Sequence, residues 1–286
     1  MHGFLKKKIK GFSFTINKSY ADVVEESFLD DLIEDACRYA LKARNGNLPK
    51  ENRLLSNGRS VYIKFWKPRR VLHHIKTIWH PTRIEIEGRQ YPQFIKTKLP
   101  IPDIVLWGSQ RIPLSKFGIF KVGMVVTKLI KRGENLSVLY KQKKQPWIVR
   151  NYHQRLEVLE KVAQLLYSIH EENLVHGDYM LKNIVFTPSK QNGKYWIIDL
   201  ASGWSLASDK SLSSSDRNHD LLRMLYSLAR NGFPQEDALH FLRTYSRHWQ
   251  GDNQSHNMTK KCLEIYGAPQ LLGFAKNTIP GNLINR

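Results

Sequence analysis

One polar segment constrains the fold of this chain more than any other, because it sets three potential proton- or metal-binding side chains among short apolar runs. The segment reads His176-Gly177-Asp178-Tyr179-Met180-Leu181-Lys182-Asn183 and continues into the apolar residues 184–186. A second apolar run, residues 195–198, ends in Asp199. The pattern predicts a loop, a strand, a hairpin and a second strand followed by the aspartate. Because Asp178 and Asn183 share one short loop, we expect their side chains to point to one place.

The side chains of Asp178, Asn183 and Asp199 are of the types that phosphoryl transfer from ATP requires at one site. One carboxylate orients or deprotonates the acceptor hydroxyl, while an amide oxygen and a second carboxylate bind Mg²⁺. Asp178 fits the first role, and Asn183 and Asp199 fit the other two. The alternative interpretation makes Asp178 and Asn183 ordinary loop residues. The combination of spacing, flanking strands and Asp199 favours the chemical interpretation.

Length and composition bound the class of protein. The 286 residues, 41% of them apolar, suffice for one large domain or two lobes. Two distant cysteines, Cys37 and Cys262, indicate a reducing compartment without a disulfide framework. We expect neither a membrane span nor a signal peptide. The formal net charge of +20 predicts an anionic partner (nucleic acid, anionic lipid or a phosphorylated substrate), unless it is only a solvated surface.

The N-terminal half carries mostly strand signals. Ser56-Asn57-Gly58 predicts a tight turn into a strand over residues 60–66, because Asn-Gly tolerates positive φ. A nucleotide-covering loop would fall at residues 44–50, although its single glycine favours a plain hairpin. The remaining predictions are a basic edge strand within residues 1–18, a short helix at 20–35, and strands at 39–41, 53–55, 103–108, 117–122 and 122–127.

Lys64 interrupts the apolar strand 60–66. A buried lysine needs an anionic partner. In an ATP-binding protein that partner is the nucleotide phosphates, held through an ion pair to a helix glutamate. The helix expected over residues 82–96, with a break or kink at Pro92, supplies Glu87 as the candidate partner. The alternative, a solvent-facing lysine on an alternating strand, is less favoured in view of the downstream loop.

The boundary between two lobes is expected near residue 131, where backbone groups of Lys128, Leu129 and Ile130 would meet the adenine edge. A basic cluster then forms either a solvated rim or an anion-binding acceptor surface; it comprises Lys131, Arg132, Lys141, Lys143, Lys144 and Arg150. Helices are predicted over residues 152–171, 220–230 and 236–250, and a short one near 260–266 in an otherwise loop-like tail.

Two further polar residues have structural interpretations. His176 is expected to bond the backbone of its loop or the second magnesium-binding segment, that of Asp199. Asp220 stands at the start of the predicted helix 220–230. It is either a favourable N-terminal charge or a buried aspartate that bonds the backbone around His176, and the two roles are compatible.

The order of these residues resembles that of the protein-kinase-like superfamily. Within it, the chain most closely resembles the bacterial lipopolysaccharide core kinases, the Kdo and heptose kinase family. A glutamate followed eleven residues later by a Gly-Ile-Pro-x-Pro-like segment is typical there. The residues that carry the resemblance are Lys10-Gly11-Phe12-Ser13-Phe14, Val61-Tyr62-Ile63-Lys64, Glu87, Lys98-Leu99-Pro100-Ile101-Pro102, His176-Gly177-Asp178, Asn183 and Ile198-Asp199.

The resemblance implies an α+β, bilobal fold. A small antiparallel-sheet lobe, residues 1–130, would bind the nucleotide, and a larger helical lobe, residues 131–286, would carry the catalytic and acceptor groups. It implies ATP and Mg²⁺ as cofactors. The implied roles are Lys64 on the phosphates, Glu87 orienting Lys64, Asp178 as base, Asn183 and Asp199 on the metal, and Lys128, Leu129, Ile130 and Lys182 as further nucleotide-binding residues.

The family's acceptors are sugar hydroxyls of the lipid-linked inner core, at the cytoplasmic face of the inner membrane. The resemblance therefore implies an anionic glycolipid acceptor, a cytoplasmic protein that is peripheral on that membrane, and no nucleic acid partner. His-Gly-Asp in place of His-Arg-Asp, and Leu-Ala after Asp199, argue against an activation-loop-regulated protein kinase. The alternatives are an atypical protein or aminoglycoside-type kinase and a basic pseudokinase that only binds.

Overall fold

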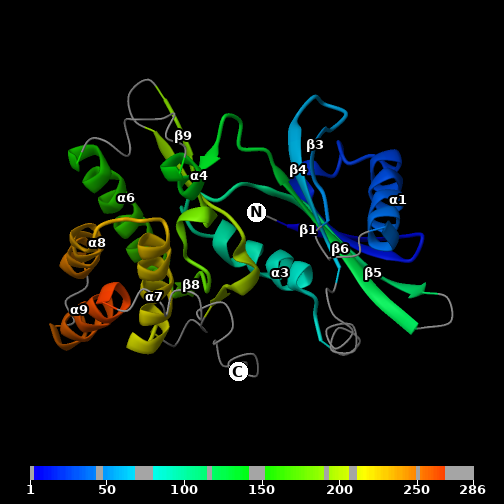
Figure 1. The fold of residues 1–286 in the computed structure, drawn as a ribbon. Coiled ribbons are helices and arrows are strands. Elements are labelled where there is room, and N and C mark those ends of the chain that lie inside the picture. Colours follow the sequence, from blue (N-terminus) through cyan, green and yellow to red (C-terminus); the bar gives the residue numbers. More distant parts are fainter. Residues whose placement is uncertain are drawn as a thin grey trace. The chain divides into compact units, whose positions relative to one another are not determined.

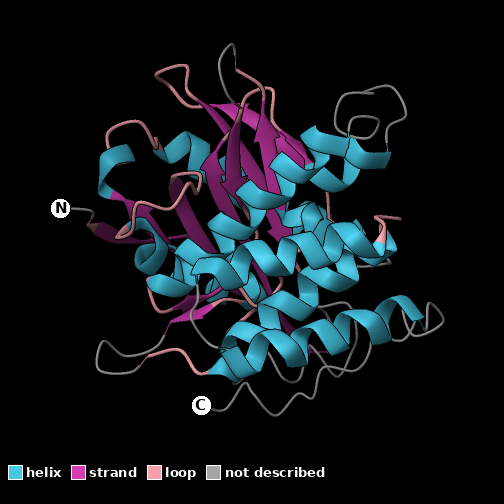
Figure 2. Ribbon diagram, turned by 90° about the vertical axis from the view of Figure 1, so that its left-hand side faces the viewer, coloured by secondary structure: helices cyan, strands magenta, loops and turns pink. Residues whose placement is uncertain are grey.

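The computed structural model describes residues 3–42, 48–67, 80–114, 118–141, 152–189, 193–205, 211–248 and 252–267. The chain divides into two compact units. The first comprises Met1–Lys131 and Asp199–Gly203, and the second Arg132–Ile198 and Trp204–Arg286. Strands dominate the first unit and helices the second, so the predicted α+β fold with an antiparallel N-terminal sheet and a helical C-terminal part is confirmed (Figures 1 and 2).

The sheet of the first unit has six antiparallel strands in the order β1-β2-β5-β6-β4-β3. Lys10 and Gly11, with φ of 47° and 85°, reverse the chain, so residues 1–18 form two strands where one was expected. The stretches expected as separate strands at 117–122 and 122–127 form a single one, β6. The bounds are β1 Phe4–Ile9, β2 Phe12–Asn17, β3 Lys50–Leu54, β4 Ser60–Trp66, β5 Ile104–Leu114 and β6 Gly118–Lys128.

The hairpin between β3 and β4 forms as predicted. Gly58 has a φ of 75°, and its N–H donates to the Leu55 carbonyl at 2.8 Å. Along β4, Val61, Ile63 and Phe65 are buried in alternation with half-buried residues. Lys64 therefore belongs to the opposite face of the sheet from this apolar row.

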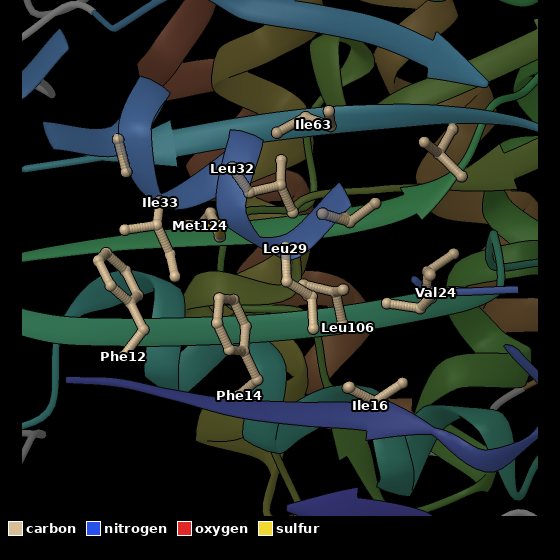
Figure 3. Close-up of a cluster of buried hydrophobic side chains, with 14 of the residues drawn as sticks. Phe12, Phe14, Ile16, Val24, Leu29, Leu32, Ile33, Ile63, Leu106 and Met124 are labelled. Atoms are coloured by element: carbon tan, nitrogen blue, oxygen red, sulfur yellow. The ribbon is translucent and has the colours of Figure 1, made fainter. Parts of the chain in front are cut away.

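Helix α1 (Glu26–Lys42) packs on the apolar face of the sheet (Figure 1). Figure 3 shows its Leu29, Leu32 and Ile33 against Phe12 and Phe14 of β2. The strand expected at residues 39–41 is wrong. These residues belong to α1, because the buried Ala36 and Ala40 continue the apolar stripe of the helix at helical spacing. A short 3₁₀ turn, η1 (Lys18–Tyr20), precedes the helix.

Helix α3 (Arg83–Ile95) covers the opposite face of the sheet (Figure 1). Thr82 and Glu85 form a capping box that starts it. Of the break or kink expected at Pro92, the break is wrong, since the helix continues through the proline. Tyr91 and Phe94 on either side are buried, so their packing outweighs the backbone hydrogen bond that proline cannot donate.

In the second unit, helices pack around two small sheets. The strand orders are β10-β9-β7 and β11-β8. The bounds are β7 Glu134–Asn135, α4 Leu136–Lys141, α6 Tyr152–Glu171, β8 Leu174–Val175, η3 Leu181–Asn183, β9 Ile184–Thr187, β10 Lys194–Ile197, β11 Trp204–Ser205, α7 Ser214–Arg230, α8 Gln235–His248 and α9 Asp252–Gly267, while η4 Leu200–Ser202 belongs to the first unit.

Two helices of this unit differ from the predictions, whereas α6 and α8 match them within two residues. Helix α7 begins six residues before Asp220, because Ser213 accepts a hydrogen bond from the Asp216 N–H and caps the helix there. Helix α9 occupies the first part of the tail expected to be loop-like, from Asp252 to Gly267. Its buried Met258, Cys262 and Ile265 recur at helical spacing, which explains why it forms.

Several predictions lie outside the described residues. They concern residues 44–47 of the expected nucleotide-covering loop, residues 68–79, and the basic residues Lys143, Lys144 and Arg150. Among the helices that the structure describes, none has the length and apolar character needed to cross a bilayer.

The contact between α3 and β5 predicts a strong effect of a single methyl group. A Cβ added at Gly88 would lie 2.3 Å from Cγ of Trp107. We expect Gly88→Ala to lower the free energy of unfolding by about 1–3 kcal/mol in chemical denaturation, although alanine favours helices over glycine. The neighbouring Arg89→Ala, at an exposed position, is the matched control. Stability of Gly88→Ala equal to that of the wild type would contradict the packing described here.

Candidate active site

The first unit pairs Lys64 with Glu87, as the sequence predicted. The Lys64 ammonium on β4 lies 2.8 Å from Oε2 of Glu87 on α3. Glu87 is 2% exposed, and its burial raises the pKa of the carboxyl group while Lys64 opposes that rise. Burial alone would lower the pKa of Lys64, but the two neighbouring carboxylates, Glu87 and Asp199, raise it. Lys64 is therefore positively charged at neutral pH.

Asp199 is a second partner of the same lysine. Its Oδ1 lies 2.8 Å from Lys64 Nζ. The residue has a left-handed backbone, with φ of 63°, at the start of η4. This conformation is uncommon for residues other than glycine, and aspartate is among those that tolerate it best.

Arg83 also contacts Asp199 and was missed by the sequence analysis. Its Nη2 lies 3.2 Å from Oδ2 of Asp199. The sequence feature that could have pointed to Arg83 was its position in the predicted helix, one turn before Glu87, which places both side chains on one helix face.

Glu85 lies on the same helix, accepts a hydrogen bond from Ser109 at 2.7 Å, and pairs with Lys121 at 2.6 Å. These bonds attach the start of α3 to β5 and β6.

In the second unit, the loop before β9 brings Asp178, Lys182 and Asn183 together. The Asn183 Nδ2 donates to Oδ2 of Asp178 at 3.0 Å and to its backbone carbonyl at 2.8 Å. The Lys182 ammonium lies 2.9 Å from the same Oδ2, and half of the Lys182 side chain is exposed. The predicted convergence of Asp178 and Asn183 in one loop is thus present, and Lys182 joins it.

Asp220 holds the backbone of this loop. Its two carboxylate oxygens accept the N–H groups of His176 and Gly177, each at 2.8 Å. Of its two proposed roles, the buried aspartate is confirmed. The helix-start role is wrong, because α7 begins at Ser214. From the same helix, the ring of His219 bonds the Gly177 carbonyl at 3.0 Å.

His176 is fully buried and bonds both segments that it was expected to serve. Its Nδ1 accepts the N–H of Asp178 at 3.3 Å, so its Nε2 carries the proton and donates to the carbonyl of Ile198 at 3.1 Å. The N–H of Ile198 in turn donates to the Asn183 carbonyl at 3.0 Å. The backbone just before Asp199 is therefore attached to the loop that carries Asp178.

A buried chain of polar groups extends behind Asp220. His170 Nε2 lies 3.3 Å from Oδ2 of Asp220, and its Nδ1 lies 2.6 Å from the Tyr245 hydroxyl. Arg217 donates to that hydroxyl at 3.3 Å. Burial raises the pKa of Tyr245 to about 12, with Arg217 opposing the rise. No pattern in the sequence had joined these residues, since they come from three helices.

Two of the three residues expected at the adenine edge use their backbone N–H groups in hydrogen bonds within the first unit. The N–H of Lys128 donates to the Asp103 carbonyl at 2.8 Å, and that of Leu129 donates to the Ser60 carbonyl at 3.0 Å. Of these three residues, Ile130 is the one whose N–H is not used in the described part of this unit. The adenine role of Lys128, Leu129 and Ile130 stays a prediction.

The side chains expected to bind Mg²⁺ suit that ion chemically. Magnesium in nucleotide sites takes one or two protein oxygens and completes its shell with phosphates and water. The amide nitrogen of Asn183 is committed to Asp178, which leaves Oδ1 as the ligand atom. The Asp199 side chain is 21% exposed and thus accessible. Within the described ranges, no three His, Cys, Asp or Glu side chains form a cluster that could hold a metal ion.

Comparison with known proteins identifies the class and then the family. The solved structure of WaaP in complex with acyl carrier protein is similar in fold, with a TM-score of 0.52 over 85% of this chain and 98% of that one. At 19% identity, this likeness shows the fold alone. No curated protein matches the sequence. The family model of the lipopolysaccharide kinase (Kdo/WaaP) family matches residues 45–245.

The chain therefore belongs to the lipopolysaccharide kinase (Kdo/WaaP) family, as its sequence motifs predicted. Members of this family are kinases, so the protein is a phosphotransferase that acts on lipopolysaccharide.

The bonds of Asp220 predict an acid-sensitive stabilisation. Burial alone would raise the pKa of Asp220, but bonds from His170 and from the His176 backbone hold it below its usual value. The ionised carboxylate thus contributes stability above about pH 4, its ordinary pKa, and this contribution is lost as the pH falls through the lower folded-state pKa. We expect Asp220→Asn to cost about 1–3 kcal/mol at pH 7, because one backbone N–H loses its acceptor.

The measurement is urea denaturation of wild type and variant between pH 7 and pH 3. The difference in unfolding free energy should shrink toward acid pH. Glu172→Gln removes one carboxylate from an exposed position in the same unit and serves as the control. A difference that is the same at every pH would contradict an ionised Asp220.

Proposed function

We propose that this chain transfers the γ-phosphoryl group of ATP to a hydroxyl group of a heptose or Kdo residue in the lipopolysaccharide inner core. The observation that carries the proposal is the ion pair of Lys64 with Glu87, beside Asp199, in a member of this kinase family. A lysine held by a helix glutamate next to a metal-binding aspartate is the arrangement by which kinases orient nucleotide phosphates.

In this proposal, Lys64 binds phosphate oxygens of ATP, and Glu87 holds the ammonium in position. Because Glu87 is buried and pairs with Lys64 at 2.8 Å, the lysine is oriented before the nucleotide binds. Asn183 and Asp199 would hold Mg²⁺, which when bound neutralises charge on the phosphates. The backbone of residues 128–130 would meet the adenine, and Lys182 would bind a phosphate oxygen.

Asp178 acts in this mechanism as the group that receives or steers the hydroxyl proton of the sugar. Both of its side-chain contacts, from Asn183 and Lys182, involve Oδ2. Oδ1 is therefore the oxygen available to the acceptor hydroxyl. The Lys182 ammonium, 2.9 Å from Oδ2, places a positive charge beside this carboxylate and helps to hold it in position.

The acceptor is an anionic glycolipid, and a net charge of +20 favours its binding electrostatically. We propose that the protein works in the cytoplasm, peripherally on the inner membrane, where such a lipid-linked acceptor is held. WaaP, the similar structure, was solved with acyl carrier protein. That protein is accordingly a partner to test for this chain.

The role of Asp178 gives a direct test. We expect Asp178→Ala to lower the phosphoryl-transfer rate by about 10²–10⁴-fold, the usual contribution of a general base. ATP binding should change little, because the proposed phosphate contacts come from other residues. Transfer is measured with radiolabelled ATP and affinity by calorimetry, with Glu172→Gln as the control. Turnover at the wild-type rate in Asp178→Ala would eliminate this residue as the base.

The sugar acceptor can be assigned by comparing purified acceptors. Kdo-linked lipid A without heptose and a heptose-containing inner core are incubated separately with ATP, Mg²⁺ and the protein. We expect phosphate on one of the two sugars, located by mass spectrometry of the product. Phosphorylation of an aminoglycoside or a protein but of neither core acceptor would overturn the proposed substrate, and ATP binding without any transfer would indicate a pseudokinase.

A further inference from the structure

The Asp199 carboxylate contacts two positively charged side chains, which is more positive charge than a carboxylate that binds a metal ion requires. Its Oδ1 lies 2.8 Å from Lys64 Nζ, and Arg83 Nη2 lies 3.4 Å from Oδ1 and 3.2 Å from Oδ2. A carboxylate that is paired with two cations binds a third cation less readily, because the charges repel. The binding of Mg²⁺ to Asp199 therefore requires that at least one of these contacts weakens.

The two cations differ in the carboxylate partner that each retains when Asp199 binds magnesium. Lys64 retains Glu87, which is buried at 2.8 Å from its ammonium. In the described part of the chain, Asp199 is the carboxylate that Arg83 pairs with. Arg83 is thus the cation that is released, and 45% of its side chain is exposed, so it can reach a ligand.

Helix stability does not explain an arginine at this position. Arg83 is the first residue of α3, where a positive charge opposes the helix dipole. The helix start is already stabilised by the reciprocal bonds of Thr82 and Glu85. Its observed partner is instead Asp199, a residue proposed to bind the metal of the nucleotide.

We propose that Arg83 is a phosphate-binding catalytic residue. Without nucleotide it neutralises Asp199, and when Asp199 binds magnesium it transfers its two hydrogen bonds to phosphate oxygens of the nucleotide. The planar guanidinium suits phosphate oxygens and stays protonated throughout, so no proton or covalent bond is exchanged in this step. The inference rests on the proposed function, because it assumes that Asp199 binds the metal of Mg·ATP.

The test is a binding measurement that needs no turnover. Calorimetry gives the affinity of a non-hydrolysable ATP analogue at saturating Mg²⁺ for wild type, Arg83→Gln and Arg83→Lys. Arg89→Gln removes the same charge from an exposed position on the same helix and is the matched control. Since charge-assisted hydrogen bonds to phosphate are lost, we expect Arg83→Gln to weaken binding by about 10- to 100-fold. Arg83→Lys should fall between, and Arg89→Gln should match the wild type.

A Mg²⁺ titration separates this role from a purely electrostatic one. If Arg83 only neutralises Asp199, Arg83→Gln lowers the Mg²⁺ concentration required and leaves nucleotide affinity at saturating Mg²⁺ unchanged, which would overturn the proposal. Equal affinity and equal Mg²⁺ dependence in variant and wild type would overturn it as well. The same assay on Asp199→Asn tests the underlying assumption: if its Mg²⁺ dependence equals that of the wild type, the proposed metal site itself fails.

Discussion

The ion pair between Lys64 and Glu87 is the constraint on which the first unit depends. A buried carboxylate is costly unless a cation is held against it, and Glu87 is almost fully buried. The pair forms only where α3 lies close on the face of the sheet opposite α1, which Gly88 permits because it has no side chain to meet Trp107. The position of Asp199 follows, since the same ammonium bonds both carboxylates.

In the second unit, hydrogen bonds between side chains and the backbone hold the loop around Asp178 in position. The loop around Asp178 has little regular structure of its own, so its N–H and carbonyl groups need other partners. Asp220, His176 and His219 supply them. Asp220 is supported by His170 and, through it, by Tyr245. These hydrogen bonds hold the backbone that carries Asp178 in one conformation.

The sequence predicted an element correctly where the local signals were strong and consistent. The turn at Gly58, strand β4 and helix α6 appear as expected, because alternation, turn chemistry and an apolar stripe agree there. Errors arose where tertiary packing outweighed a local signal. The helix through Pro92 and the length of α9 are set by buried side chains, whose partners are not visible in the local sequence.

By itself the sequence determined the family, because its motifs follow the order of that family from Lys64 through Asp178 to Asp199. Only the tertiary structure showed the contacts of residues that no motif had singled out. The contact of Arg83 with Asp199 joins residues 116 positions apart, and that of His170 with Tyr245 joins residues 75 apart. Such contacts depend on how whole elements pack, and no local pattern of residue types records that packing.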